Sequence, residues 1–112
     1  MGKVTYIPDR GDIIKLDFSP TKGHEQRGYR PALVISAKKY NAKTKRAVVC
    51  PMTSKILDYP FVTILKSSEV SGSILLDQIR SVDWNAREVT FIMKASNEVL
   101  EEATDKLIAL IA

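Results

Sequence analysis

The side chains that could do chemistry are concentrated in one polar stretch of the sequence, residues 19–30. A loop of this length in a small domain is unusual, and such loops are often functional. An arginine in it could bind phosphate, and a carboxylate or an imidazole could move a proton. From the residues alone, a solvated surface loop is the better explanation. The polar side chains of the stretch include those of Lys22, His24, Glu25, Gln26, Arg27, Tyr29 and Arg30.

The residue types present exclude several kinds of catalysis. His24 is the only histidine, so acid–base catalysis by two histidines of one chain is excluded. No His, Cys, Asp and Glu cluster has metal-ligand spacing, and no glycine loop of the Walker or dinucleotide type occurs. Cys50, the only cysteine, lies in an apolar run, where a buried small side chain is a better interpretation than a catalytic thiol. Polar residues at strand ends and in the long loop remain as candidates.

Length and composition indicate one ordinary globular domain. The chain has 112 residues, of which 45% are hydrophobic and 27% are charged. This is enough for one small core, so we expect a single domain spanning residues 1–112. The formal charge of +4 permits a polyanionic partner without demanding one. Because the sequence shows neither a signal peptide nor an apolar run long enough to cross a bilayer, we expect a cytoplasmic protein without membrane attachment.

The elements that must position the candidate residues are short strands. Alternating and continuous apolar runs predict these strands, with a turn at residues 41–45. In the first strand Ile14, Leu16 and Phe18 share one face. Later in the chain Ile79 and Val82 are expected to point inward. The predicted strands cover residues 12–18, 32–36, 46–50, 61–65, 73–76, 78–84 and 89–93.

The C-terminal segment changes to a helical period. Ser96 or Asn97 can cap a helix there, and an apolar stripe recurs at the spacing of one helix face. Many short strands followed by one helix predict a mainly β fold with a C-terminal helix, in which the sheet is strongly bent or forms a partial barrel. The stripe consists of Val99, Ala103, Leu107 and Leu110, with Leu100 and Ile111 beside it.

Three blocks of sequence, in this order and spacing, resemble the MazF/PemK family of toxin endoribonucleases. They are residues 20–36, residues 50–54 and residues 72–83. Residues 8–14 and 59–61 are also similar to that family, so the resemblance covers nearly the whole chain. An isolated Arg-Pro or Asp-Gln pair would carry no information, but the three blocks together are specific.

The resemblance implies a fold, an activity and partners. The implied fold is a small SH3-like barrel with a C-terminal helix, the MazF/CcdB-type toxin fold. The implied protein is a homodimer and the toxin of a type II toxin–antitoxin system, an mRNA interferase that cuts single-stranded RNA within a short preferred sequence. It needs no cofactor or metal ion, and a cognate acidic antitoxin encoded nearby inhibits it.

The resemblance also assigns site residues by position. Arg30 and Thr53 match the catalytic pair of the family, and Glu25 and Gln26 match its active-site loop. Gln78 and Arg80 match a strand near the RNA groove.

These residue types suit RNA cleavage, because RNA carries its own nucleophile, the 2′-hydroxyl group. The enzyme must then remove a proton and stabilise the charge that develops on the phosphate. Arg30 offers a planar fork that matches two phosphate oxygens, and Thr53 offers a hydroxyl donor. We expect Arg30 to act as electrostatic stabiliser, while either Glu25 or His24 is the general base. Arg27 is expected to steer phosphate rather than to react.

Other residues are expected to bind RNA rather than to react. Tyr29 and Tyr59 are aromatic residues that can stack on bases, whereas core packing is expected for Phe61 and Trp84. The loop after Thr53, from Ser54 and Lys55 to Tyr59, is the expected place of base recognition.

Two other functions suit a similar fold. One is a toxin of the same architecture that acts on gyrase, and the other is a non-catalytic barrel that binds RNA or protein. The pairing of Arg30 with Thr53 argues against a gyrase-directed toxin. A cleavage assay distinguishes both alternatives from an RNA-cleaving enzyme.

Overall fold

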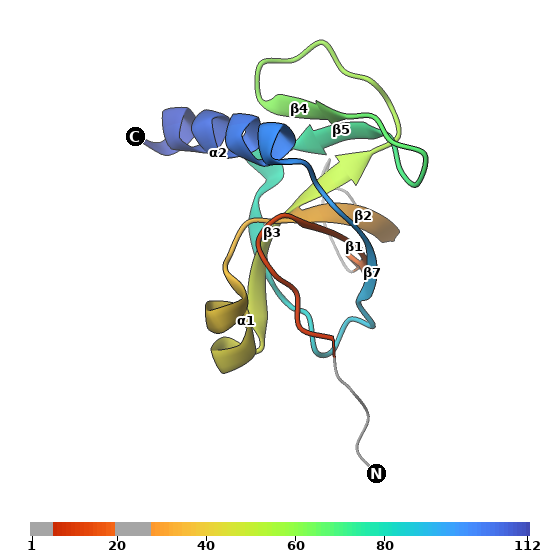
Figure 1. The fold of residues 1–112 in the computed structure, drawn as a ribbon, viewed down its shortest axis with the longest axis vertical. Coiled ribbons are helices and arrows are strands. Elements are labelled where there is room, and N and C mark those ends of the chain that lie inside the picture. The colour runs from red at the N-terminus through yellow and green to blue at the C-terminus, as the bar shows by residue number, and fades with distance from the viewer. Residues whose placement is uncertain (1–5, 20–27) are drawn as a thin grey trace.

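The long strand β3 (Arg46–Thr53) connects the two halves of one antiparallel sheet (Figure 1). The structure is a computed structural model, and it describes residues 6–19 and 28–112. On one edge β3 pairs with β2, and on the other it pairs first with β6 and then, near its end, with β5. This change of partner lets the sheet bend into a half-barrel. The other elements are β1 (Asp12–Asp17), β2 (Tyr29–Val34), α1 (Lys38–Thr44), β4 (Val62–Leu65), β5 (Gly72–Leu75), the short 3₁₀ helix η1 (Leu76–Gln78), β6 (Arg80–Asp83), β7 (Thr90–Lys94) and α2 (Asn97–Ile111).

Two hydrophobic cores lie on opposite sides of this sheet. Because side chains alternate along a strand, the fully buried neighbours Ile13 and Ile14 enter different cores. The first core contains Ile13 and is covered by α2 through Ala103 and Leu107. The second core contains Ile14 and, as predicted, Leu16 and Phe18 on the same face. A bent, mainly β sheet with a C-terminal helix confirms the predicted fold class.

The helix α2 begins where the sequence predicts, but its apolar stripe is only partly buried. The side chain of Ser96 caps the helix by accepting a hydrogen bond from the backbone N–H of Val99. Leu110 and Ile111 are 36% and 79% exposed. The reason is geometric, since the last turn of α2 extends past the sheet (Figure 1).

Two further predictions about local structure are wrong. The expected turn at residues 41–45 is the end of helix α1. This helix has no apolar stripe, because the polar Asn41 anchors it: its amide donates to the carbonyl oxygens of Pro8 and Ser36, at 2.8 and 3.0 Å. Ile79, expected inside, is 37% exposed. The short helix η1 ends just before it and breaks the alternation from which its inward direction was inferred.

Trp84 confirms the predicted role in the core. Its ring is only 3% exposed within the second core, and its indole N–H donates to the backbone oxygen of Asn41 at 3.0 Å. Phe61 is half-buried and packs edge-on against the ring of Tyr59. Over the part of the chain that the structure describes, no helix is long and apolar enough to span a membrane.

Candidate functional site

Arg30 and Thr53 lie on the neighbouring strands β2 and β3. The ladder between these strands pairs Ala32 with Pro51, and the same register continued by two residues places Arg30 opposite Thr53. Side chains opposite each other on antiparallel strands have Cβ atoms about 4.5–5.5 Å apart. Both side chains are partly buried. The continued register therefore places Arg30 and Thr53, which are 23 positions apart in the sequence, opposite each other just beyond the last pair of the ladder.

A second cation lies on the same side of the sheet. Arg80 precedes the buried Val82 by two residues on β6, so both side chains point toward the second core. The guanidinium carbon of Arg80 lies 5.5 Å from the centre of the Phe18 ring. Arg30 and Thr53 alternate in the same way with core residues of their own strands. The end of the second core thus carries two guanidinium groups and one hydroxyl, a donor set suited to phosphate.

Two small residues of β5 fix the position of Thr53 and the loop after it. A Cβ atom on Gly72 would lie 2.0 Å from the carbonyl oxygen of Thr53, so only glycine lets the strands approach this closely. Next to it, the hydroxyl of Ser73 donates to the carbonyl oxygen of Lys55 at 2.8 Å and accepts from the N–H of Leu57 at 2.9 Å. The loop that follows Thr53 is therefore attached to the sheet.

The close approach at Gly72 gives a stability prediction. Gly72→Ala is expected to lower the free energy of unfolding by about 1–3 kcal/mol through overpacking. Its backbone also has a positive φ of 153°, which adds strain. The matched control is Gly28→Ala, where φ is 81° but a Cβ would meet nothing within 4 Å. Urea unfolding measures both variants, and an equal loss in the two would contradict the proposed contact.

A pocket of about 420 Å³ lies beside this loop. The hydroxyl of Tyr59 donates to a carboxylate oxygen of Asp77 at 2.5 Å across it, and this hydrogen bond raises the pKa of Tyr59. Tyr59 and Gln78 are among the residues predicted from the sequence, whereas Asp77 is not, although it directly precedes Gln78 in the block of residues 72–83. The pocket is lined by Leu57, Asp58, Tyr59, Leu75, Asp77 and Gln78.

The structure separates Tyr29 from Arg30. Successive side chains of a strand point to opposite sides, so these two neighbours on β2 face apart. The hydroxyl of Tyr29 donates to the carbonyl oxygen of Glu88 at 2.6 Å, and the amine of Lys15 lies 5.4 Å from its ring centre. Ser54 and Lys55 are exposed on the loop after Thr53.

Four predicted residues, His24, Glu25, Gln26 and Arg27, lie outside the described residues. The flanks of that segment are held together next to β2. The N–H of Phe18 donates to the carbonyl oxygen of Gly28 at 2.9 Å, and the N–H of Gly28 donates to the hydroxyl of Ser19 at 3.1 Å. The two flanks of residues 20–27 therefore lie next to each other, and Gly28 is two residues before Arg30.

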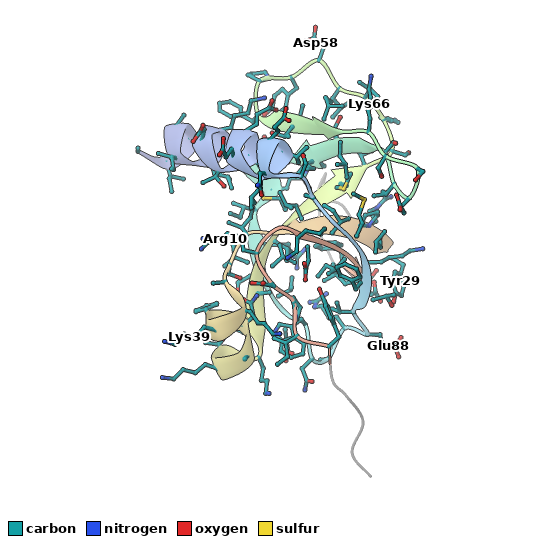
Figure 2. All side chains as sticks on the ribbon, viewed as in Figure 1. Arg10, Tyr29, Lys39, Asp58, Lys66 and Glu88 are labelled. Carbon is teal, nitrogen blue, oxygen red and sulfur yellow. The ribbon has the colours of Figure 1, made fainter. Side chains whose placement is uncertain are left out.

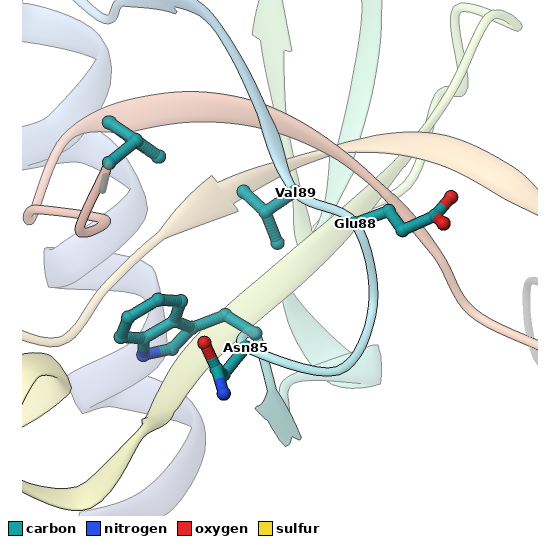
Figure 3. A pocket seen from close by; sticks show the side chains of 5 residues that line it. Asn85, Glu88 and Val89 are labelled. Atoms are coloured by element: carbon teal, nitrogen blue, oxygen red, sulfur yellow. The ribbon is translucent and has the colours of Figure 1, made fainter. Parts of the chain in front are cut away.

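Cys50 and the other reactive groups that the structure describes form no second site of this kind. Burial raises the pKa of the Cys50 thiol to about 12, and the charge of Asp77 acts in the same direction, which leaves a thiol rather than a thiolate. Within residues 6–19 and 28–112 no three His, Cys, Asp or Glu side chains gather as metal ligands would. A pocket of about 210 Å³ next to Trp84, Asn85 and Val89 contains none of the predicted site residues (Figure 3).

Comparison with known proteins gives consistent matches along the chain. Residues 9–111 match the family described as PemK-like, MazF-like toxin of type II toxin–antitoxin system. The chain is 42% identical over 106 residues to the endoribonuclease toxin MazF of Escherichia coli K12, covering 95% of this chain and 96% of that protein. It is 35% identical over 109 residues to the endoribonuclease toxin ChpB of the same strain, covering 92% and 93%.

Solved structures give the same result. The crystal structure of MazF from Deinococcus radiodurans superposes with a TM-score of 0.90 at 42% identity, covering 96% of this chain and 98% of that one. A crystal structure of MazE–MazF from the same organism superposes with a TM-score of 0.85 at 38% identity, with the same coverage. The similarity therefore extends over sequence and fold alike.

Proposed function

The chain belongs to the PemK-like, MazF-like family of toxins of type II toxin–antitoxin systems and is an endoribonuclease, and we propose that it cuts single-stranded RNA without a metal ion. The observation that carries this proposal is the position of Arg30 opposite Thr53 in the register of β2 and β3. The target is messenger RNA, cut within a short preferred sequence. Residues 1–112 act as one cytoplasmic toxin domain.

In the proposed reaction the 2′-hydroxyl oxygen of the RNA attacks the adjacent phosphorus. The bond from O2′ to phosphorus forms and the bond from phosphorus to O5′ breaks, which leaves a 2′,3′-cyclic phosphate and a 5′-hydroxyl. The guanidinium of Arg30 binds two phosphate oxygens, and the hydroxyl of Thr53 donates to the same phosphate. Glu25 or His24 takes the proton of the 2′-hydroxyl. The departing O5′ keeps the electron pair of the broken bond and takes up a proton from water, while Gln26, Arg27 and Arg80 hold the strand.

The pocket beside Thr53 suits a nucleobase next to the cut phosphate. The ring of Tyr59 is 43% exposed and offers a stacking surface. Asp77 and Gln78 add an acceptor and an amide that can pair with base edges. Ser54 and Lys55 precede the pocket on the loop, where they contact the backbone of the same nucleotides.

Removal of the Tyr59 ring tests this base subsite. Tyr59→Ala is expected to raise KM for RNA by about tenfold to a hundredfold, because stacking on one base contributes about 1–3 kcal/mol. Tyr59→Phe keeps the ring and serves as the control, with a much smaller rise. Steady-state cleavage of one fluorescent RNA measures both. A wild-type KM for Tyr59→Ala would contradict the subsite.

The assembly is proposed to be a homodimer. Large apolar side chains remain exposed on the described surface, among them Ile56, Phe91, Ile108 and Ile111 at 47–79%. A stable interface buries about 1,200–2,000 Å² in total, which would cover such side chains. Light scattering is expected to give twice the 12.5 kDa of the chain. A monomer at micromolar concentration would contradict this proposal.

We also propose that an antitoxin protein binds this chain and inhibits it. The MazE–MazF structures of Deinococcus radiodurans name such a partner for a relative of 38% identity. An acidic and partly disordered segment that folds on binding suits a basic groove.

The test of the proposed function is cleavage of a mixed-sequence RNA in the presence of a chelator. Cleavage there supports it. Intact RNA together with inhibition of gyrase would favour the gyrase-directed alternative, and binding without cleavage would favour a non-catalytic barrel.

A further inference from the structure

A second basic surface lies at the other end of β3 from Thr53. We call it the α1 patch, and within it five of the nine residues 38–46 are basic while none is acidic. In Figure 2 its Lys39 lies at the lower left, whereas Tyr29, next to Arg30, lies at the right. All five basic side chains are exposed, and they belong to Lys38, Lys39, Lys43, Lys45 and Arg46.

The charges of this patch oppose the stability of the helix that carries them. Lys38 and Lys39 occupy the first turn of α1, where the helix dipole disfavours cations and the helix has no acidic residue of its own. The carboxylate of Asp9, from outside the helix, accepts a hydrogen bond from the backbone N–H of Lys38 at 3.0 Å. Lys39 and Lys43 are four residues apart, so they repel each other along one face. Neither forms an ion pair with a residue that the structure describes. A bound polyanion would reduce the repulsion between Lys39 and Lys43.

The patch is rigidly placed and carries an aromatic ring. The buried side chain of Asn41 anchors α1 through its hydrogen bonds to Pro8 and Ser36. Tyr40 is 46% exposed between the lysines. Cations that alternate with an exposed aromatic ring are typical of surfaces that bind single-stranded nucleic acid, where bases stack and phosphates pair. This combination favours RNA, rather than an acidic protein segment, as the partner of the α1 patch.

The patch and the candidate active site also lie on the same side of the sheet. Trp84, whose indole N–H donates to Asn41, belongs to the second core, and Arg30 and Thr53 lie at the far end of that core. The strand β3 separates them by seven residue steps from Arg46 to Thr53, or about 23 Å at 3.3 Å per residue. A stacked single strand covers this span with about seven nucleotides at roughly 3.4 Å each.

We propose that the α1 patch binds the phosphates of RNA that flanks the cleaved sequence, so that long substrates bind more tightly than short ones. This inference rests on the proposed function, because it extends the same RNA path beyond the cut site. The patch takes no part in the chemistry and therefore affects KM rather than kcat.

The test compares Lys39→Glu with Lys66→Glu, an equal charge change at an exposed lysine beyond β4 (Figure 2). Two RNAs that share the cleaved sequence serve as substrates. One has about five nucleotides and is too short to reach the patch, and the other has about twenty. Lys39→Glu is expected to raise KM at least about threefold for the long RNA only, and to lower the salt slope of its binding by about 0.7. Helix α1 keeps its fold, since a glutamate in the first turn favours the dipole.

Each other outcome overturns the inference. These outcomes are an unchanged KM for the long RNA, an equal rise for the short RNA, an equal effect of Lys66→Glu, or a loss of antitoxin binding with RNA binding intact. If the wild-type protein cuts neither RNA, the proposed function fails instead, and binding of the long RNA measured by fluorescence anisotropy still tests the patch.

Discussion

Arg30→Ala is expected to lower the rate of RNA cleavage by about a hundredfold to a thousandfold, the usual loss when one donor to a developing oxyanion is removed. Continued past its last pair, the register of β2 and β3 places Arg30 opposite Thr53. Arg30→Lys is expected to restore little, because a point charge cannot grip two phosphate oxygens as the planar fork does. Single-turnover cleavage of one defined RNA measures the rate.

Arg10→Ala is the matched control for Arg30→Ala. The guanidinium of Arg10 is exposed and donates to the carbonyl oxygen of Ile35, away from Thr53. The control should cut at the wild-type rate, and both variants should unfold in the same range of urea. The role of Arg30 would be refuted by an Arg30→Ala variant as active as Arg10→Ala.

An RNA with 2′-deoxyribose at the cut position is expected to bind and to remain whole. The proposed reaction uses the 2′-hydroxyl as nucleophile, so removal of this one atom should abolish the attack, while the proposed phosphate contacts of Arg30 and Thr53 should persist. EDTA should leave the cleavage of unmodified RNA unchanged. Mass spectrometry of the products should show a 2′,3′-cyclic phosphate on the upstream fragment and a 5′-hydroxyl on the downstream one.

The same RNA with 2′-deoxyribose one nucleotide away from the cut is the control, and it should be cut. A 5′-phosphate on the downstream fragment would show that water attacked instead. A requirement for added magnesium would be equally damaging, since the proposed reaction uses only the residues of the protein and the hydroxyl of the substrate.

The sequence by itself determined the fold class and the chemistry of the candidate residues. Alternating and continuous apolar runs predicted most strands, and Ser96 with the stripe after it predicted α2. The motifs around Arg30, Thr53 and Gln78 determined the family, which the comparisons confirmed. Local patterns of this kind depend on residues close together in the chain.

Only the tertiary structure decided which residues meet. No local pattern predicts that Arg30 lies opposite Thr53, because strand register is set by the packing of both cores. None predicts the close approach of β5 to Thr53 that Gly72 permits. For the same reason the hydrogen bond from Tyr59 to Asp77 and the opposite directions of Tyr29 and Arg30 appeared only in the fold. The sequence did not predict helix α1, because the helix has no apolar stripe of its own. It is stabilised instead by the buried residue Asn41, whose hydrogen-bond partners include residues far along the chain.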